Sequence, residues 1–266
     1  MDIALPLVDT HAHIFTRRMP FSSLAWNKPD YEFTVEQFLQ TLDAHHIPFG
    51  VIGAASIFDD YSDYTLQALN TYKRLRATVI VAPEIERDTL ARMQAQGVSG
   101  IRFVWNRTKD LPDLHSPAYS RLLVRVADLG LHVQIYLDAK RLPPVLDRLN
   151  EFDLNIAVDH FGDPDTDQSL QCPGFQSVLR SVQKGRTWVR LSSPYRMKDP
   201  SAAPTYVEAL LKAAGPERLM WGSDAPFVAY ETRITYQDEV RQFLRWIPDP
   251  QVRSAISQTA LKFYFF

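Results

Sequence analysis

Val8-Asp9-Thr10-His11-Ala12-His13 ends a short apolar run near the start of the chain and places two histidines two residues apart. Residues i and i+2 of a β-strand point to the same side, so on a strand both imidazoles face one site. Two converging imidazoles can bind a metal, stabilise an oxyanion or move a proton. The rest of the sequence has to decide among these roles.

Strand-like apolar runs alternate with amphipathic helical patterns along the whole chain. The eight predicted strands are Leu5–His11, Phe49–Ala55, Ala77–Ala82, Val98–Val104, Leu131–Tyr136, Leu154–Asp159, Thr187–Ser192 and Arg218–Gly222. The predicted helices are Thr34–His45, Tyr64–Leu75, Asp88–Gln96, Pro117–Leu129, Arg141–Leu149, Gly174–Gln183, Ala203–Ala213, Tyr236–Trp246 and Pro250–Leu261. This alternation favours a closed parallel barrel, and 266 residues match the roughly 250 that such a barrel takes. We therefore expect an α/β fold, a (β/α)8 TIM barrel that forms a single domain over residues 1–266.

The composition is that of an ordinary globular protein, with 45% hydrophobic residues, 23% charged residues and a formal net charge of -2. This charge balance argues against binding to nucleic acid or to anionic membranes. No apolar run reaches the roughly 18 residues of a membrane span, and the N-terminus lacks the basic and apolar regions of a signal peptide. Cys172 is the only cysteine, which excludes an intramolecular disulfide and favours a cytoplasmic location. The oligomeric state stays open.

Polar residues follow the predicted strands at their carboxyl ends. In a barrel of this kind these ends meet at one face, where active sites form. The side chains concerned are those of His11, His13, Arg102, Arg107, Tyr136, Asp138, Asp159, His160, Ser192, Ser193, Tyr195, Arg196, Ser223 and Asp224. The segment Thr16–Phe33, rich in proline and aromatic residues, follows the first strand and is expected to lie over the same face.

Each of these residues also has a structural interpretation. Asp224 lies in a stretch where an aspartate can serve as a turn or cap residue. His160 could cap its strand or bond to Asp159. Arg102 interrupts an apolar strand, so its buried charge needs an anionic partner, either an internal carboxylate or a substrate anion. We interpret as structural or inert the side chains of His45, His46, His115, His132 and Cys172.

Five motifs together resemble the amidohydrolase superfamily, and within it the family of 2-pyrone-4,6-dicarboxylate lactonase and its relatives. Asp-Thr-His-x-His on the first strand and an aspartate on the eighth are signature elements of the superfamily. The motifs are Val8–His13, Gly100–Phe103, His132–Tyr136, Val158–Pro164 and Trp221–Pro226. They occur in the family's order over the whole chain, and the set is specific although each motif alone is weak.

The resemblance implies hydrolysis of a small carboxylated lactone, from aromatic or sugar-acid breakdown, without a required metal. It assigns Asp224 as the general base on water, and it places around the scissile carbonyl the imidazoles of His11, His13 and His160. Arg102 and Arg196 match arginines that hold the substrate carboxylates, and the implied substrate site also includes Arg107 and Tyr136. Elementary chemistry agrees, because imidazoles can stabilise an oxyanion, a carboxylate can accept a proton from water, and arginine binds carboxylates bidentately.

Missing ligands argue against a binuclear metal site. Binuclear relatives use a carboxylated lysine or a glutamate from strand four and a histidine from strand five. Here strand four offers no lysine, and strand five ends in Ile135-Tyr136-Leu137-Asp138. The ligand types of a mononuclear zinc site are still present in His11, His13, His160 and Asp224. We expect no cofactor, with one zinc ion as the alternative.

Two departures from the family pattern leave the exact lactone open. Ala225-Pro226-Phe227 follows Asp224, where the family commonly has Trp-Pro and a polar residue. Arg102 and Arg107 are also closer together by one residue than in the family pattern. The alternatives within the superfamily are a lactone isomerase and a mononuclear-zinc decarboxylase or hydrolase. From another class, the alternative is a non-catalytic binder of small anions.

Overall fold

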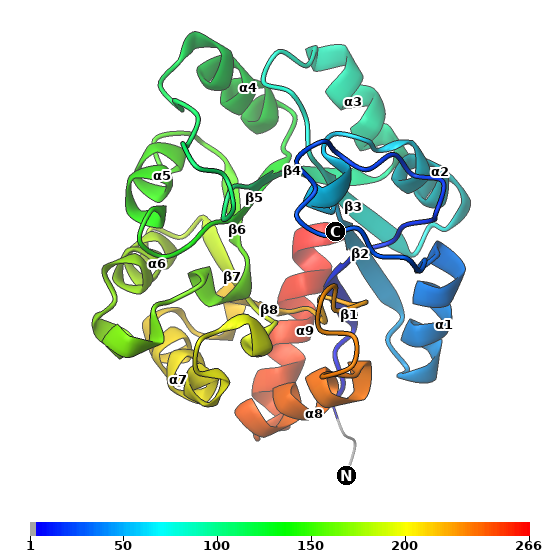
Figure 1. Cartoon of the computed structure of the whole chain (residues 1–266). Helices are drawn as coiled ribbons and strands as arrows, with labels where there is room; N and C mark the ends of the chain where they lie inside the picture. The colour runs from blue at the N-terminus through cyan, green and yellow to red at the C-terminus, as the bar shows by residue number, and fades with distance from the viewer. Residues whose placement is uncertain (1–3) are drawn as a thin grey trace.

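The computed structural model describes residues 4–266, so residues 1–3 of the N-terminal stretch considered for a signal peptide lie outside the described part. Eight parallel strands pair in chain order from β1 to β8 and surround a common axis, with the helices outside them (Figure 1). The strands are β1 (Val8–Ala12), β2 (Phe49–Gly53), β3 (Leu75–Val79), β4 (Val98–Val104), β5 (His132–Tyr136), β6 (Asn155–Val158), β7 (Thr187–Leu191) and β8 (Leu219–Trp221). The predicted (β/α)8 TIM barrel is confirmed.

The helices follow the predicted alternation. They are α1 (Val35–Ala44), α2 (Asp63–Thr71), α3 (Arg87–Gln96), α4 (Pro117–Asp128), α5 (Leu142–Leu149), α6 (Pro173–Gln183), α7 (Ala203–Ala214), α8 (Tyr236–Trp246) and α9 (Pro250–Tyr264). A capping box begins α1, because Thr34 and Gln37 each accept a hydrogen bond from the other's backbone N–H. Among residues 4–266, none of the helices has the length and hydropathy of a membrane span.

The boundary between α2 and β3 differs from the prediction. The pattern predicts a helix as far as Leu75, but α2 ends at Thr71 and Leu75 begins β3. Leu75 is buried and pairs with Gly50 of β2, and strand pairing therefore overrides the helical spacing. For the same reason β3 spans Leu75–Val79, nearer the N-terminus than the predicted strand Ala77–Ala82.

The first and last strands close the barrel through backbone and side-chain hydrogen bonds. The backbone N–H of His13 donates to the carbonyl of Ala225 at 2.7 Å, and that of Asp224 donates to the carbonyl of His11 at 2.7 Å. The buried Asp9 carboxylate accepts from the backbone N–H of Ser223 at 2.9 Å. Burial raises the pKa of Asp9 to about 6, although the hydrogen bonds from Ser223 and its other neighbours oppose this shift. Closure therefore places the end of β1 directly beside Asp224.

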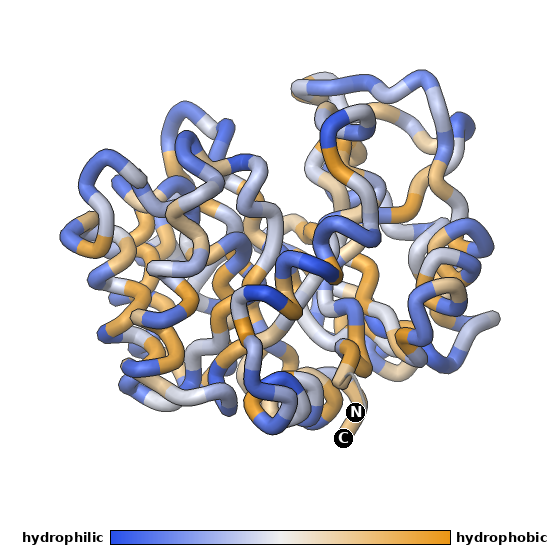
Figure 2. Tube along the Cα trace, turned by 90° about the horizontal axis from the view of Figure 1, so that it is seen from below, coloured by the Kyte–Doolittle hydropathy of each residue, from blue (hydrophilic) through white to orange (hydrophobic). Residues whose placement is uncertain are grey.

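The amino-terminal end of the barrel is filled with apolar side chains. Val8, Val51 and Met220 pack there against Ala260 and Tyr264 of α9. Figure 1 shows α9 lying beside β1 and β8, and Figure 2 shows hydrophilic stretches mainly along the outline of the molecule. Because the amino-terminal end is closed in this way, a ligand reaches the barrel from the carboxyl ends of the strands.

The segment between β1 and α1 folds back over the carboxyl ends of the strands. Phe15 and Phe33 exchange two backbone hydrogen bonds of 2.8 and 3.0 Å, which fix the two ends of this loop. Apolar contacts with Ile57 and Val228 hold the segment against loops from other parts of the barrel. The expected position of this segment over the active face is therefore observed.

His132, at the start of β5, is a titratable residue buried in the barrel interior. Its ring is buried edge-on against Phe263 and Tyr264. Burial, assisted by the charge of Arg190, lowers the pKa of His132 to about 3.

We predict that His132→Leu makes stability less sensitive to acid. The unfolded chain protonates His132 near pH 6.5, whereas the folded protein keeps it neutral, so the free energy of unfolding falls as pH drops below 6.5. At about 1.4 kcal/mol per pH unit, the variant should lose roughly 2 kcal/mol less than the unchanged protein between pH 7 and pH 5. Urea unfolding at the two pH values measures this difference, and equal losses would contradict it.

Candidate active site

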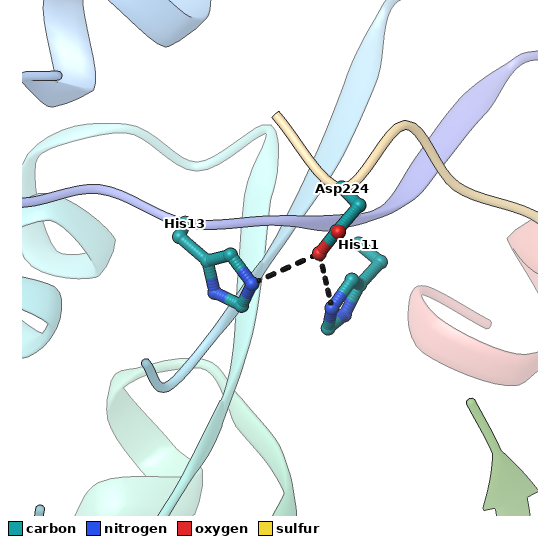
Figure 3. A group of neighbouring side chains, drawn as sticks. All are labelled: His11, His13 and Asp224. Carbon is teal, nitrogen blue, oxygen red and sulfur yellow. Dashed lines mark hydrogen bonds and ion pairs between the residues drawn. The ribbon is translucent and has the colours of Figure 1, made fainter. Parts of the chain in front are cut away.

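His11 of β1 and His13, one residue beyond the end of β1, converge on one carboxylate oxygen. Nε2 of His11 lies 3.3 Å from Oδ1 of Asp224, and Nε2 of His13 lies 3.1 Å from the same atom (Figure 3). His13 also places Nδ1 at 2.7 Å from the backbone carbonyl of Gly53, so its ring faces an acceptor on each nitrogen. The spacing of the two histidines on one strand face produces this convergence.

The other oxygen of Asp224 has two further donors. The hydroxyl of Tyr195 donates to Oδ2 at 2.7 Å, and Nε of Arg196 donates to the same atom at 2.8 Å. Burial alone would raise the pKa of Asp224, but the charge of Arg196 and the hydrogen bonds from His11 and His13 hold it well below its usual range. Asp224 is therefore an ionised carboxylate surrounded by donors.

His160 follows β6 and faces the same site. Its Nδ1 lies 2.8 Å from the hydroxyl of Ser192, so it pairs with the end of β7 and not with its neighbour Asp159. The ring lies edge-on to His11 and to Tyr136, with centroid separations of 5.3 and 4.7 Å. Burial lowers the pKa of His160 to about 3, so this imidazole is neutral at physiological pH.

Asp159 is the internal carboxylate that the buried Arg102 requires. Nη2 of Arg102 donates to Oδ2 of Asp159 at 2.9 Å, and Arg190 of β7 pairs with Oδ1. The side chains of all three residues are nearly inaccessible, so each guanidinium depends on this carboxylate for its counter-charge. Burial lowers the pKa of Arg102 to about 10, but its side chain still carries its charge at neutral pH.

Gln134 of β5 connects this ion network to His11. Its amide nitrogen donates to both oxygens of Asp159 at 3.0 and 2.8 Å, and its carbonyl accepts from Thr78 at 2.7 Å. The same nitrogen lies 3.0 Å from Nδ1 of His11. Since Nδ1 faces a donor, the neutral ring carries its proton on Nε2, toward Asp224. Burial, followed by the charge of Arg102, lowers the pKa of His11 well below its usual range, which keeps the ring neutral.

Several site residues have left-handed backbone conformations. The φ angles are 50° at His160, 54° at Ser193 and 65° at Asp224. Non-glycine residues at positive φ are uncommon, and each costs roughly 1–3 kcal/mol where it is strained. Such strain is concentrated at functional sites, where the surrounding structure fixes it. Here it accompanies sharp turns after β6, β7 and β8, and two of these residues, His160 and Asp224, line the pocket.

A pocket opens above these side chains and, including its mouth, holds about 520 Å³ of space. Arg102, Arg107, Tyr136 and Arg196, the four residues that the sequence places at the substrate, all line the pocket, together with His13, His160 and Asp224. The guanidinium of Arg107 lies 4.2 Å above the ring of Trp26 at the pocket edge, which brings the loop after β1 into the site. The pocket is thus positively charged around one carboxylate.

Three of these residues have the ligand types of a zinc site. His11, His13 and Asp224 bring three ligand atoms within 4.8 Å of one another. A metal-bound histidine normally donates its other ring N–H to an acceptor, but Nδ1 of His11 faces the amide donor of Gln134. The guanidiniums of Arg102 and Arg196 also lie beside His11 and Asp224. This hydrogen-bond and charge pattern does not fit a zinc ligand set.

Sequence reasoning missed Gln134 and Arg190 as parts of the site. Arg190 had a local signal, because it interrupts an apolar strand as Arg102 does. Tyr195 was expected at the active face without a role, because its contact with Asp224 joins residues that are far apart in the sequence. Gln134 lies inside a quoted motif, but nothing local indicates its contacts with Asp159 and His11.

Comparison with known proteins gives the family. The family model described as amidohydrolase matches residues 8–266. The chain belongs to the amidohydrolase family. This amidohydrolase is 26% identical over 231 residues to a 4-sulfomuconolactone hydrolase of Hydrogenophaga intermedia, covering 84% of this chain and 75% of the relative.

Solved structures resemble the amidohydrolase over nearly its whole length. A probable 2-pyrone-4,6-dicarboxylic acid hydrolase from Acinetobacter baumannii, with citric acid bound, superposes with a TM-score of 0.93 at 28% identity, covering 98% of this chain and 100% of that one. A structure from Pseudomonas putida with the same assigned activity gives a TM-score of 0.90 at 32% identity, with coverages of 98% and 99%. The resemblance to the lactonase-like amidohydrolases is confirmed, and the chain is an enzyme of this family.

We predict that Asp159→Asn destabilises the fold strongly. The substitution leaves two buried guanidiniums without their counter-charge, and breaking such a pair costs roughly 3–5 kcal/mol. Asp153→Asn is the matched control, because Asp153 pairs with Arg186 at the exposed surface and such pairs contribute little. Urea unfolding at pH 7 measures both variants. A loss for D159N no larger than that for D153N would show that the ion network does not stabilise the barrel.

Proposed function

We propose that this protein is a metal-independent hydrolase that opens the ester ring of a small carboxylated lactone, similar to 2-pyrone-4,6-dicarboxylate. The observation that carries the proposal is an ionised, buried Asp224 at a pocket whose walls hold the neutral imidazole of His160 and several arginines. Relatives named as hydrolases of 4-sulfomuconolactone and of 2-pyrone-4,6-dicarboxylic acid support the choice of a lactone ester. The citric acid bound in one of these structures is a compact polycarboxylate.

In the proposed reaction, Asp224 acts as general base. A water molecule within hydrogen-bond reach of the carboxylate attacks the lactone carbonyl, and Asp224 takes its proton. The ring C–O bond then breaks, and Asp224 returns the proton to the leaving oxygen. The products are one hydroxyl or enol on the opened ring and one new carboxylic acid, which loses its remaining proton to solvent and becomes a carboxylate.

The imidazoles stabilise the charge that develops on the carbonyl oxygen. His13 and His160 line the pocket, while His11 is fully buried with its Nε2–H directed at Asp224. We assign Nδ1 of His160 as the acceptor in its 2.8 Å contact with the Ser192 hydroxyl, which leaves the proton on the other ring nitrogen for donation to the oxyanion. Preorganised donors of this kind are commonly worth about 10²–10³ in rate each.

The arginines select an anionic substrate. Arg107 and Arg196 line the pocket with their guanidiniums, and a carboxylate is the planar anion that such groups bind bidentately. Arg102 also lines the pocket, but its strongest partner is Asp159, so it contributes positive charge more than a free binding group. Tyr136 supplies a phenol whose pKa burial raises, so it stays protonated and can donate.

We predict that purified protein hydrolyses at least one member of a panel of carboxylated lactones and that Asp224→Asn lowers kcat by about 10²–10⁴. The amide keeps the shape of the side chain but cannot take a proton from water. Thermal unfolding checks that D224N keeps its fold. Product mass identifies the reaction: hydrolysis adds water, isomerisation leaves mass unchanged, and decarboxylation loses carbon dioxide. Either of the last two products, or full activity in D224N, would overturn the proposed reaction.

The metal-independent mechanism makes a separate prediction. Elemental analysis of the purified protein should find zinc and other transition metals well below one equivalent per chain, since the donor facing His11 opposes ligation. Dialysis against a chelator should leave kcat unchanged. A stoichiometric metal whose removal abolishes turnover would favour the zinc alternative at His11, His13, His160 and Asp224.

A further inference from the structure

Both acceptor sites on Oδ2 of Asp224 are occupied by protein donors. A carboxylate offers about four lone-pair sites, two on each oxygen. Oδ2 accepts from Tyr195 and Arg196, while Oδ1 lies beside Nε2 of His11 and Nε2 of His13. A water molecule that is to give its proton to Oδ2 needs one of its two sites. Tyr195 or Arg196 must therefore move when substrate binds.

Arg196 is the neighbour that is free to move. His11 is completely buried and held by Gln134, and His13 is held by the carbonyl of Gly53. Arg196 binds Asp224 through Nε, while its two terminal nitrogens make no hydrogen bond within residues 4–266. These nitrogens belong to a side chain that lines the pocket. A substrate carboxylate that binds them competes directly with Asp224 for the same cation.

Tyr195 can keep Asp224 in place if Arg196 turns away. Its hydroxyl is 2.7 Å from Oδ2, and its ring packs against Phe227 and Tyr230 with centroid separations of 6.1 and 5.0 Å. Burial and the charge of Asp224 raise the pKa of Tyr195 well above its usual value, so the phenol remains a donor. The guanidinium of Arg196 lies 5.3 and 5.2 Å from the rings of Tyr195 and Tyr230, and these aromatic faces support it beside Asp224.

We propose that Asp224 and the substrate carboxylate compete for Arg196, and that Tyr195 is a positioning residue that holds Asp224 while the arginine turns to the substrate. The inference rests on the proposed function and adds a consequence to it. Departure of Arg196 opens a lone-pair site on Oδ2 for the attacking water. The substrate carboxylate therefore raises kcat as well as lowering KM, because a lactone without it leaves Arg196 on Asp224.

The first test is a crystal structure of the protein with citrate, which needs no turnover and so separates this inference from the proposed reaction. We expect a citrate carboxylate on the terminal nitrogens of Arg196, with Nε of Arg196 more than 3.5 Å from Oδ2 of Asp224 and the Tyr195 hydrogen bond intact. Citrate bound with the Arg196–Asp224 bond retained would overturn the competition. Absence of citrate from Arg196 at saturating concentration would overturn it as well.

The second test measures Tyr195→Phe on a carboxylated lactone and on its carboxylate-free analogue. The variant keeps the ring packing, and we expect kcat to fall about tenfold or more on the carboxylated lactone with KM little changed. On the analogue, where Arg196 still holds Asp224, the fall should be about twofold. Equal losses on both substrates would assign Tyr195 a merely structural role.

Tyr230→Phe is the matched control, because the Tyr230 ring also supports Arg196 but the Tyr230 hydroxyl does not contact Asp224. The effect of this substitution should be equal on the two substrates.

Discussion

The buried carboxylate of Asp159 holds the guanidiniums of Arg102 and Arg190 inside the barrel, and the geometry of the site depends on this ion network. A charge inside a protein is expensive unless it is paired and hydrogen-bonded. Here the pairs also use Gln134, Thr10 and Tyr264 as hydrogen-bond partners, so the network joins β1, β4, β5, β6, β7 and α9. A network that is satisfied in this way is rigid, and it fixes where its neighbours can lie.

One of these neighbours is His11, and through it the ion network reaches the reacting groups. Gln134 can donate to His11 only because Asp159 and Thr78 fix the orientation of its amide. The proton of the neutral His11 ring consequently lies on the nitrogen toward Asp224. The structure thus links a buried arginine pair to the tautomer of a histidine, and that tautomer favours an oxyanion donor over a metal ligand.

Much of the architecture follows from the sequence, because strand and helix periodicity and the His-x-His spacing are local properties. The strand order, the convergence of His11, His13 and Asp224, and the pocket-lining positions of Arg102, Arg107, Tyr136 and Arg196 all agree with that reading. The α2 boundary was wrong because pairing of Leu75 with β2 decides it. The partners of Arg102 and Arg196 were not predictable, since each lies on a different strand or loop and both an internal carboxylate and a substrate anion satisfy an arginine. Their pairing with Asp159 and Asp224 is a property of the closed barrel.

In the proposed mechanism, Asp224 activates water without a metal. Single-turnover opening of a carboxylated lactone in ¹⁸O-labelled water, by protein dialysed against a chelator, tests it most directly. We expect the metal-depleted protein to form product with one ¹⁸O atom in the new carboxylate. D224N should form no product on the same time scale. Product that forms only after zinc is restored, or that carries no label, would contradict it.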